Sequence, residues 1–277
     1  MKIKNLFFDA KKYSSKYDKY FEVYENQLKP FLNKKIILVE IGVLNGGSLE
    51  IWKKYFGSKA RIIGIDLNPE CKKYEQKGIE VFIGDQSCTK FWKSFFNKVG
   101  KVDIIVDDGG HTNFQQIIST VATIPNIKDN GILIVEDTHS SYLSEFSNPS
   151  KYSFIEFVKK IIDDINFSFN KSIGSFKFSL KEHIYSIQIF ESIVVFYINR
   201  KKTYENYFLE NRKLSKGLRD YRYAGSKFAK FYYSRFIYKF KFLIKTRFFN
   251  YIWKKIIFFA RFNDNINEIK KYIKYFK

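Results

Sequence analysis

Acidic residues and histidines gather where two apolar runs of the chain end, the runs being 102–107 and 131–136. The residues concerned are Asp107, Asp108, His111, Glu136, Asp137 and His139. If the two runs form neighbouring parallel strands, their carboxyl ends lie about 5 Å apart at one edge of the sheet. Crowded carboxylates repel one another unless a cation neutralises them, and carboxylates without cysteine suit a hard ion such as Mg²⁺. The sequence therefore predicts a divalent metal site, with the candidate ligands Asp107, Asp108, Glu136 and Asp137.

Activation of a hydroxyl group is the chemistry that such a site offers. A metal with open positions binds substrate hydroxyls and lowers the pKa of one of them, and a nearby base then removes the proton. His139, two residues beyond Asp137, is the predicted base because imidazole titrates near neutral pH. The alternative for each histidine is a hydrogen bond to loop backbone, and for His111 the alternatives of positioning the substrate and supporting the loop stay open. His183 is expected to be structural.

A glycine-rich turn follows the apolar run 35–41 and leads into a helical segment. It reads EIGVLNGGS, and glycines there let the backbone and the helix N-terminal amides approach a ligand closely. The spacing lacks the GxG pair of a dinucleotide site, and a carboxylate beside the turn would repel a diphosphate. S-adenosylmethionine has no phosphate and carries a positive amino group. The turn therefore predicts an S-adenosylmethionine site formed by Glu40, Gly42, Asn45, Gly46, Gly47 and Ser48.

Two further acids stand at the ends of apolar runs. Asp66 ends the run 61–66, where a carboxylate can accept both hydroxyls of a ribose. Asp85 and Gln86 follow the run 79–83, where a carboxylate can accept the adenine amino group. Each acid alone would more often be a solvated loop residue. Three acids in register at successive strand ends favour the cofactor site.

The spacing of these runs predicts the fold class. Continuous apolar runs separated by helical segments indicate strands that are buried on both faces of a parallel sheet. Two later runs, 184–190 and 193–199, lie too close together for a helical crossover and predict an antiparallel hairpin with a turn near 191–192. We expect an α/β fold, a doubly wound, mainly parallel, Rossmann-like seven-stranded sheet with an antiparallel edge hairpin. A leading helix is predicted over 13–33, the catalytic domain over 1–200 and a basic helical extension over 201–277.

The order of these motifs resembles the metal-dependent sugar O-methyltransferases of the macrolide-mycinose type and related bacterial surface-polysaccharide methyltransferases. The resemblance covers about the first 200 residues and is carried by DKY, VEIGVLNGGSLEIWKKYF, IIGIDLNP, VDDGGH, VEDTHSSY and SIQIFESIVVFYINR. It implies a class I methyltransferase that uses S-adenosylmethionine and Mg²⁺. The implied metal ligands are Asp107 or Asp108, Glu136 and Asp137, and the implied base is His139. Catechol-type relatives use a lysine as base, and no lysine stands near this acidic pair in the sequence.

Composition indicates the compartment of the protein and the part of the chain where its positive charge is concentrated. Only two cysteines are present, without a CxxC motif, so neither a disulfide framework nor a zinc site is suggested and a reducing cytoplasm fits. No apolar stretch has the length of a signal peptide or a spanning helix, so we expect a cytoplasmic protein. The net charge is +21, and residues 225–277 hold eleven lysines and three arginines against two acids, a net charge of +12.

The basic extension also holds many aromatic residues, a composition that suits an anionic membrane surface. The basic positions do not gather on one helical face, so two short helices broken near 246–250 are expected. The alternatives are a cap packed on the catalytic domain or in a homo-oligomer and, less favoured, a nucleic-acid contact. The function hypothesis is methylation of a sugar hydroxyl on a nucleotide-linked or lipid-linked glycan precursor at the inner membrane face. Another small acceptor, such as a phenol or phosphate-type group, and a non-catalytic tethered module are the rival hypotheses.

Overall fold

The computed structural model describes residues 2–146, 151–167, 178–204 and 247–276, together with 207, 209 and 211. The chain divides into two compact units, Met1–Tyr207 and Phe208–Lys277. The first unit contains every residue that the sequence assigns to the cofactor and metal sites. The predicted extension falls largely on the second unit, of which residues 212–246 lie outside the described part.

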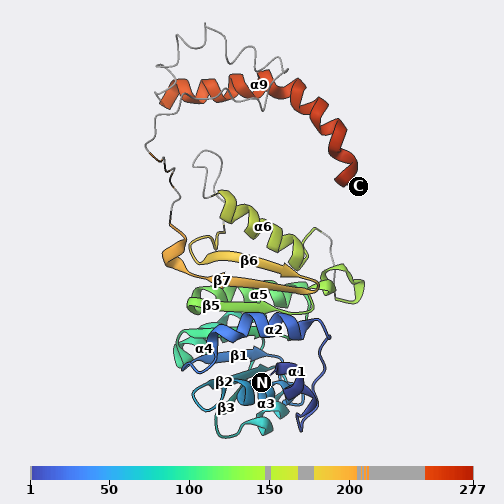
Figure 1. Ribbon diagram of the computed structural model, residues 1–277, viewed down its shortest axis with the longest axis vertical. Coiled ribbons are helices and arrows are strands. Elements are labelled where there is room, and N and C mark those ends of the chain that lie inside the picture. The colour runs from blue at the N-terminus through green and yellow to red at the C-terminus, as the bar shows by residue number, and fades with distance from the viewer. Residues whose placement is uncertain are drawn as a thin grey trace. The chain divides into compact units, whose positions relative to one another are not determined.

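A seven-stranded sheet forms the centre of the first unit, with the strand order β3-β2-β1-β4-β5-β7-β6 (Figure 1). The strands are β1 Ile37–Ile41, β2 Arg61–Asp66, β3 Ile79–Ile83, β4 Val102–Asp107, β5 Ile127–Val135, β6 Ile184–Phe190 and β7 Ile193–Ile198. Strands β1 to β5 are parallel, and β7 pairs antiparallel with both β5 and β6. The predicted doubly wound sheet with an antiparallel edge hairpin is confirmed. Ser192, with φ 65°, forms the tight turn between β6 and β7.

One strand boundary differs from the prediction. Strand β5 begins at Ile127, four residues before the predicted run. The first residues of β5 include the polar Lys128 and Asp129, so this part of the strand is not an apolar run in the sequence. Lys128 nevertheless pairs with Asp103 on β4 at 2.8 Å, and the register with β4 shifts after the first pair, Val102 with Ile127. The cross-strand ion pair therefore accompanies a stretch of strand that apolar patterning alone misses.

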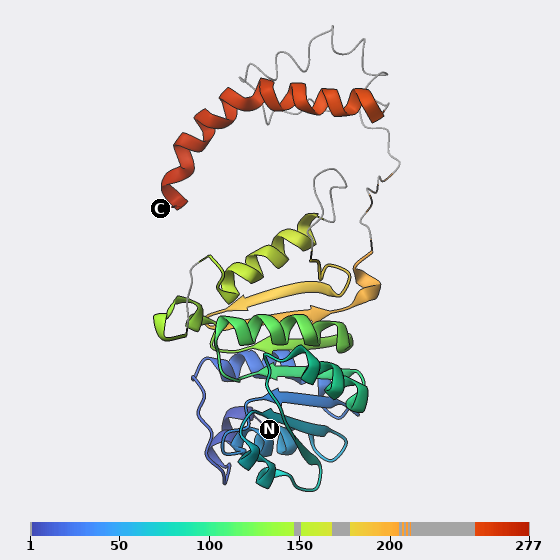
Figure 2. The same ribbon diagram turned by 180° about the vertical axis from the view of Figure 1, so that it is seen from behind.

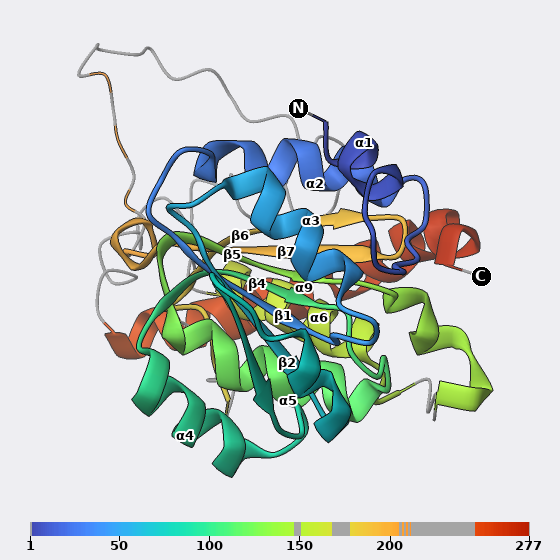
Figure 3. The ribbon, with the colours of Figure 1, turned by 90° about the horizontal axis from the view of Figure 1, so that it is seen from below.

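Helices cover both faces of the sheet, as Figures 2 and 3 show. One face carries α1 Ile3–Phe8, α2 Tyr20–Leu28 and α3 Gly47–Phe56, and the other carries α4 Thr89–Val99, α5 Asn113–Thr123 and α6 Phe154–Phe167. Trp52 on α3 and Trp92 on α4 are each 1% exposed and lie in the two opposite apolar clusters. Burial on both faces explains why the strands are continuous apolar runs.

The predicted leading helix over 13–33 is shorter in the structure. Helix α2 begins only at Tyr20, and the short 3-10 turn Lys29–Phe31 follows it. Residues 13–16 have no regular secondary structure and line a cavity instead. The predicted helix is thus correct for α2 and wrong for residues 13–19, which are not helical.

In the second unit the structure describes helix α9, Arg247–Tyr272, followed by the short 3-10 helix η8, Ile273–Phe276. The helix is continuous from Arg247 onward, so the described residues show no break at 247–250. The remainder of the predicted pair of helices lies outside the described residues. Among the helices of the described residues, none has the length and apolar content needed to span a membrane.

Candidate active site

A cavity of about 750 Å³ opens where the parallel strands end. Pockets that bind small molecules are commonly 300–1,000 Å³, so a nucleoside-sized ligand fits this space. Its walls come from the N-terminal segment and from the loops after five strands. The lining comprises 13–17, Tyr20, 41–44, 47–48, 65–67, 84–86, 108–111, Gln115 and Asp137.

The glycine turn is built for close backbone contacts. Gly42 has φ 91°, and a Cβ atom there would lie 2.0 Å from the carbonyl oxygen of Asp108. A Cβ on Gly47 would lie 2.3 Å from the carbonyl oxygen of Tyr13, and Gly47 begins α3 after Gly46 in the left-handed conformation. The turn therefore needs glycine where it meets the loop after β4 and the N-terminal segment.

The Asp66 carboxylate, at the end of β2, stabilises the glycine turn by accepting hydrogen bonds from it. It accepts hydrogen bonds from the amides of Val43 and Leu44, at 2.8 and 3.1 Å, and from Asn68 at 2.8 Å. Burial by itself would raise the pKa of Asp66, but these amide donors outweigh it and hold the pKa below its usual value. An ionised acid thus stays at the cavity wall between the turn and β2.

The predicted cofactor residues divide into two groups. Those that line the cavity are Gly42, Gly47, Ser48, Asp66, Asp85 and Gln86. Asn45 is exposed outside the lining, and Gly46 shapes the start of α3. Glu40 is fully buried behind the turn, where its carboxylate accepts a hydrogen bond from Ser48 at 2.6 Å. Burial raises the pKa of Glu40 to about 7.

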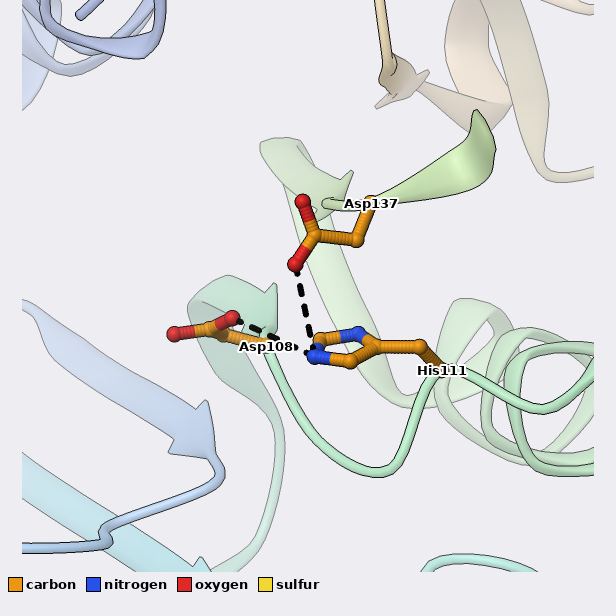
Figure 4. Close-up of side chains that lie close together, drawn as sticks. All are labelled: Asp108, His111 and Asp137. Atoms are coloured by element: carbon orange, nitrogen blue, oxygen red, sulfur yellow. Dashed lines mark ion pairs between the residues drawn. The ribbon is translucent and has the colours of Figure 1, made fainter. Parts of the chain in front are cut away.

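Asp108, His111 and Asp137 lie together at the edge of the cavity (Figure 4). Nε2 of His111 is 3.3 Å from Oδ2 of Asp137 and 3.8 Å from Oδ1 of Asp108. His111 and Asp137 both have positive φ angles, 57° and 54°, and their side chains point toward each other (Figure 4). One ligand atom from each of the three residues lies within 4.8 Å of the others.

Asp107 and Glu136 are not among the residues that line the cavity. Asp107 is 1% exposed, and its carboxylate accepts hydrogen bonds from Gln86 and from Ser119 on α5. Burial raises the pKa of Asp107 above its usual range. Glu136 is fully buried, and the Tyr24 hydroxyl donates to its Oε1 at 2.6 Å. Of the two neighbouring aspartates that the sequence left open, Asp108 is the one at the cavity.

A residue that sequence reasoning missed stands among these acids. Nζ of Lys16, from the N-terminal segment, donates to Oε2 of Glu136 at 2.8 Å and to Oδ2 of Asp108, and lies 4.0 Å from Glu40. Its side chain is only 4% exposed. No lysine is near the acidic pair in the sequence, but Lys16 contacts Glu136 in space. A separation of 120 positions from Glu136 leaves no local signal that could have found it.

His139 and His111 occupy different surroundings. His139 follows Asp137 in the short 3-10 helix Thr138–Tyr142, has a side chain 41% exposed and is not among the residues that line the cavity. Its Nδ1 makes a hydrogen bond with Oγ of Ser192. His111 lines the cavity. His183 contacts Arg200, away from the site.

The donors at the cavity edge fit a divalent cation. Two carboxylates converge there beside the His111 imidazole, and hard ions such as Mg²⁺ accept carboxylate oxygens readily. Nδ1 of His111 is buried and has no hydrogen-bond partner among the described residues, so Nε2 is the nitrogen directed at the carboxylates. The cluster also lies on the wall of the cavity that the glycine turn borders.

Comparison with known proteins identifies similar enzymes. The 2'-O-methyltransferase of Streptomyces olivaceus that acts on 8-demethyl-8-alpha-L-rhamnosyl tetracenomycin-C is 27% identical over 157 residues, 53% of this chain and 41% of that protein. The mycinamicin VI 2''-O-methyltransferase of Micromonospora griseorubida is 29% identical over 154 residues, 51% of this chain and 38% of that protein. The resemblance to sugar O-methyltransferases is confirmed. The chain spans about two fifths of the length of these curated relatives.

A solved structure shares the fold. The MycE methyltransferase from the mycinamycin biosynthetic pathway, in complex with Mg and SAH, superposes with a TM-score of 0.65 at 22% identity. The match covers 72% of this chain and 55% of MycE. No protein-family model matches the chain.

Proposed function

We propose that this chain transfers a methyl group from S-adenosylmethionine to a sugar hydroxyl, with the help of a divalent metal. The observation that carries the proposal is the meeting of two features in one cavity. The glycine turn and Asp66 line one part of the cavity, and the cluster of Asp108, His111 and Asp137 lines the part beside it. The similarity to sugar O-methyltransferases supports the same chemistry.

The methyl donor is proposed to lie along the glycine turn. Gly42, Gly47 and Ser48 line the cavity along the turn. Asp66 is the proposed acceptor for the ribose hydroxyls, and Asp85 for the adenine amino group. Glu40 acts from behind the turn, because its carboxylate is buried and holds Ser48 rather than lining the cavity.

The acceptor hydroxyl is proposed to be activated at the cluster. Asp108 and Asp137 are the proposed metal ligands, and a metal held there would lower the pKa of a bound hydroxyl. His111 replaces His139 as the proposed base, because its Nε2 lies at the cluster while His139 stands outside the cavity. The hydroxyl oxygen bonds to the methyl carbon, the carbon–sulfur bond breaks with its electron pair on sulfur, and the hydroxyl proton passes to Nε2 of His111.

Two variants and their parent test this function. We titrate S-adenosylmethionine calorimetrically into wild type, Asp137→Asn and the control Asp163→Asn, whose acid is exposed on α6, and then assay methyl transfer to a panel of nucleotide sugars. Donor binding in all three, with Mg²⁺-dependent transfer in wild type and Asp163→Asn only, is the expected result. A folded wild-type chain that does not bind S-adenosylmethionine would refute the proposal and favour a non-catalytic tethered module.

The proposed acceptor is a glycan precursor of a bacterial surface polysaccharide, handled at the inner membrane face. The basic extension supports this location. Helix α9 exposes large aromatic residues, namely Phe248, Tyr251, Phe258 and Phe259. It also exposes the lysines Lys254, Lys255, Lys270 and Lys271. Interfacial aromatics with cationic side chains bind anionic lipid surfaces.

Vesicle flotation tests the membrane contact. The full chain is expected to float with phosphatidylglycerol vesicles and not with phosphatidylcholine vesicles, and Lys254→Glu/Lys255→Glu should weaken flotation. Lys159→Glu/Lys160→Glu, an equal charge change on exposed positions of α6, is the control. Equal recovery with both lipids would contradict the membrane contact, and a change of oligomeric state in the α9 variant would favour the cap or homo-oligomer.

A further inference from the structure

The segment between α1 and α2 is attached to the active site through one buried side chain. Within residues 11–19 every residue is exposed or half-buried, and Tyr13 and Tyr17 are 63% and 59% exposed. The Lys16 side chain, in contrast, is 4% exposed and reaches the acids at the strand ends. Burying an ammonium group is costly unless carboxylates pair with it, so these pairs hold the segment in place.

The partners of Lys16 include a residue of the proposed metal site. Asp108 uses Oδ2 for Lys16, and its Oδ1 faces His111. Glu136 divides its carboxylate between Lys16 and the Tyr24 hydroxyl, so both of its oxygens are occupied by the chain itself. Glu40 is a third acid, with its Oε1 4.0 Å from Nζ of Lys16, and this oxygen has no hydrogen-bond partner among the described residues. Lys16 therefore sits at a position of strong negative charge that would suit any cation.

A divalent ion and the ammonium group compete for these oxygens. Mg²⁺ prefers about six oxygen ligands in an octahedral arrangement. Asp108 and Asp137 offer it few, and the adjacent Glu136 is the nearest further carboxylate along the chain. Glu136 can turn an oxygen to a metal only by giving up Lys16 or the Tyr24 hydroxyl. Lys16 is the partner that a metal would displace, because the positive charges of metal and ammonium repel each other in a buried site where water screens them little.

We propose that Lys16 is an internal cation that a divalent metal displaces from Asp108 and Glu136, so that metal binding releases the segment 11–19 from the cavity. The inference rests on the proposed metal site. It makes the segment a latch, closed by Lys16 in the metal-free protein. Release would open the part of the cavity wall formed by Tyr13, Ser14 and Ser15.

The test measures Mn²⁺ binding and backbone exchange rather than activity. Free Mn²⁺ is followed by electron paramagnetic resonance during titration of wild type, Lys16→Met, Asp137→Asn and the control Lys19→Met, which alters an exposed lysine paired with Glu191. Lys16→Met is expected to bind Mn²⁺ about tenfold more tightly than wild type, or about 1.4 kcal/mol. Lys19→Met should match wild type, and Asp137→Asn should bind weakly.

Hydrogen exchange of peptides covering residues 9–19 completes the test in the unmodified chain. Mn²⁺ should accelerate exchange there in wild type, and Lys16→Met should exchange fast with and without metal. Equal Mn²⁺ affinities for wild type and Lys16→Met, or exchange in wild type that Mn²⁺ leaves unchanged or slows, would overturn the latch while the metal site stands. No Mn²⁺ binding by any variant would sink the metal site and the latch together. The wild-type exchange result remains decisive if Lys16→Met does not fold.

Discussion

The buried Glu40 carboxyl should make the stability of this protein depend on pH. Burial raises its pKa from 4.5 to about 7, because the desolvation of the charged form outweighs the attraction of Lys16. The folded chain therefore keeps this proton to a higher pH than the unfolded chain does. The resulting stability is fully present below about pH 4.5 and is lost as pH rises to about 7. Each pH unit in that window costs about 1.4 kcal/mol, so the loss is about 3 kcal/mol.

Glu40→Gln isolates this contribution, because an amide of the same shape accepts the Ser48 hydrogen bond and does not ionise. Urea unfolding of wild type and Glu40→Gln, in EDTA at pH 5, 6, 7 and 8, gives the difference in unfolding free energy at each pH. Other groups titrate in both proteins and cancel. The difference should change by about 3 kcal/mol in favour of the variant from pH 5 to 8. Glu22→Gln, exposed on α2, should show no such trend. A difference that stays constant with pH for Glu40→Gln would refute the reasoning.

Three further predictions concern the site. His111→Gln should lower methyl transfer by about 10²–10⁴ and His139→Gln by less than about tenfold, in single-turnover assays, and the reverse order would restore His139 as base. Gly42→Ala should abolish donor binding in calorimetry, because the new Cβ would lie 2.0 Å from the carbonyl oxygen of Asp108. Gly57→Ala is the control, because Gly57 also has a positive φ but faces open space. This variant should lose only about 1–3 kcal/mol of unfolding free energy and still bind the donor. Ser119→Ala should lower the unfolding free energy by about 1–3 kcal/mol in urea because it takes a donor from a buried carboxylate, and no loss would show that water replaces it.

The strands and the edge hairpin were predictable because each follows a strong local rule. Runs such as 61–66 and 102–107 are apolar throughout since both faces of the sheet are covered by helices. The short gap between 184–190 and 193–199 leaves no room for a crossover, and the structure has an antiparallel hairpin there. The start of β5 escaped the rule because Lys128 and Asp129 are polar, and their partners Asp103 and Arg200 are distant in sequence.

Side-chain contacts from the N-terminal segment were not predictable in the same way. Nothing local to Lys16 distinguishes it from the other lysines of a lysine-rich chain. The position of Lys16 depends on where the loop between α1 and α2 crosses the strand ends. That crossing is a feature of the tertiary structure and has no local signal in the sequence. The expected base, His139, stays a prediction, and its surroundings were not predictable for a related reason. His139 is closer than His111 to the acidic pair in sequence, but the 3-10 helix that follows Asp137 turns it toward Ser192.

The choice between Asp107 and Asp108, in contrast, follows from strand alternation. Successive side chains of a strand point to opposite faces. On β4, Ile105 packs in the cluster that contains α4 and α6, whereas Val106 packs in the cluster of α1, α2 and α3. Asp107 therefore shares the face of Ile105 and meets Ser119 on α5, while Asp108 shares the face of Val106 and meets Lys16.

The same alternation explains why three acids surround one lysine. Leu38 on β1 and Ile134 on β5 pack in the cluster with α1, α2 and α3, and two positions later on the same faces stand Glu40 and Glu136. These strands and β4 are neighbours, so their acids converge on the face that the N-terminal segment crosses. In or just beyond each of these three strands, an acid stands two positions after a residue of this cluster, which is Leu38, Val106 or Ile134. The three acids therefore favour a cation on that face, and Lys16 supplies one.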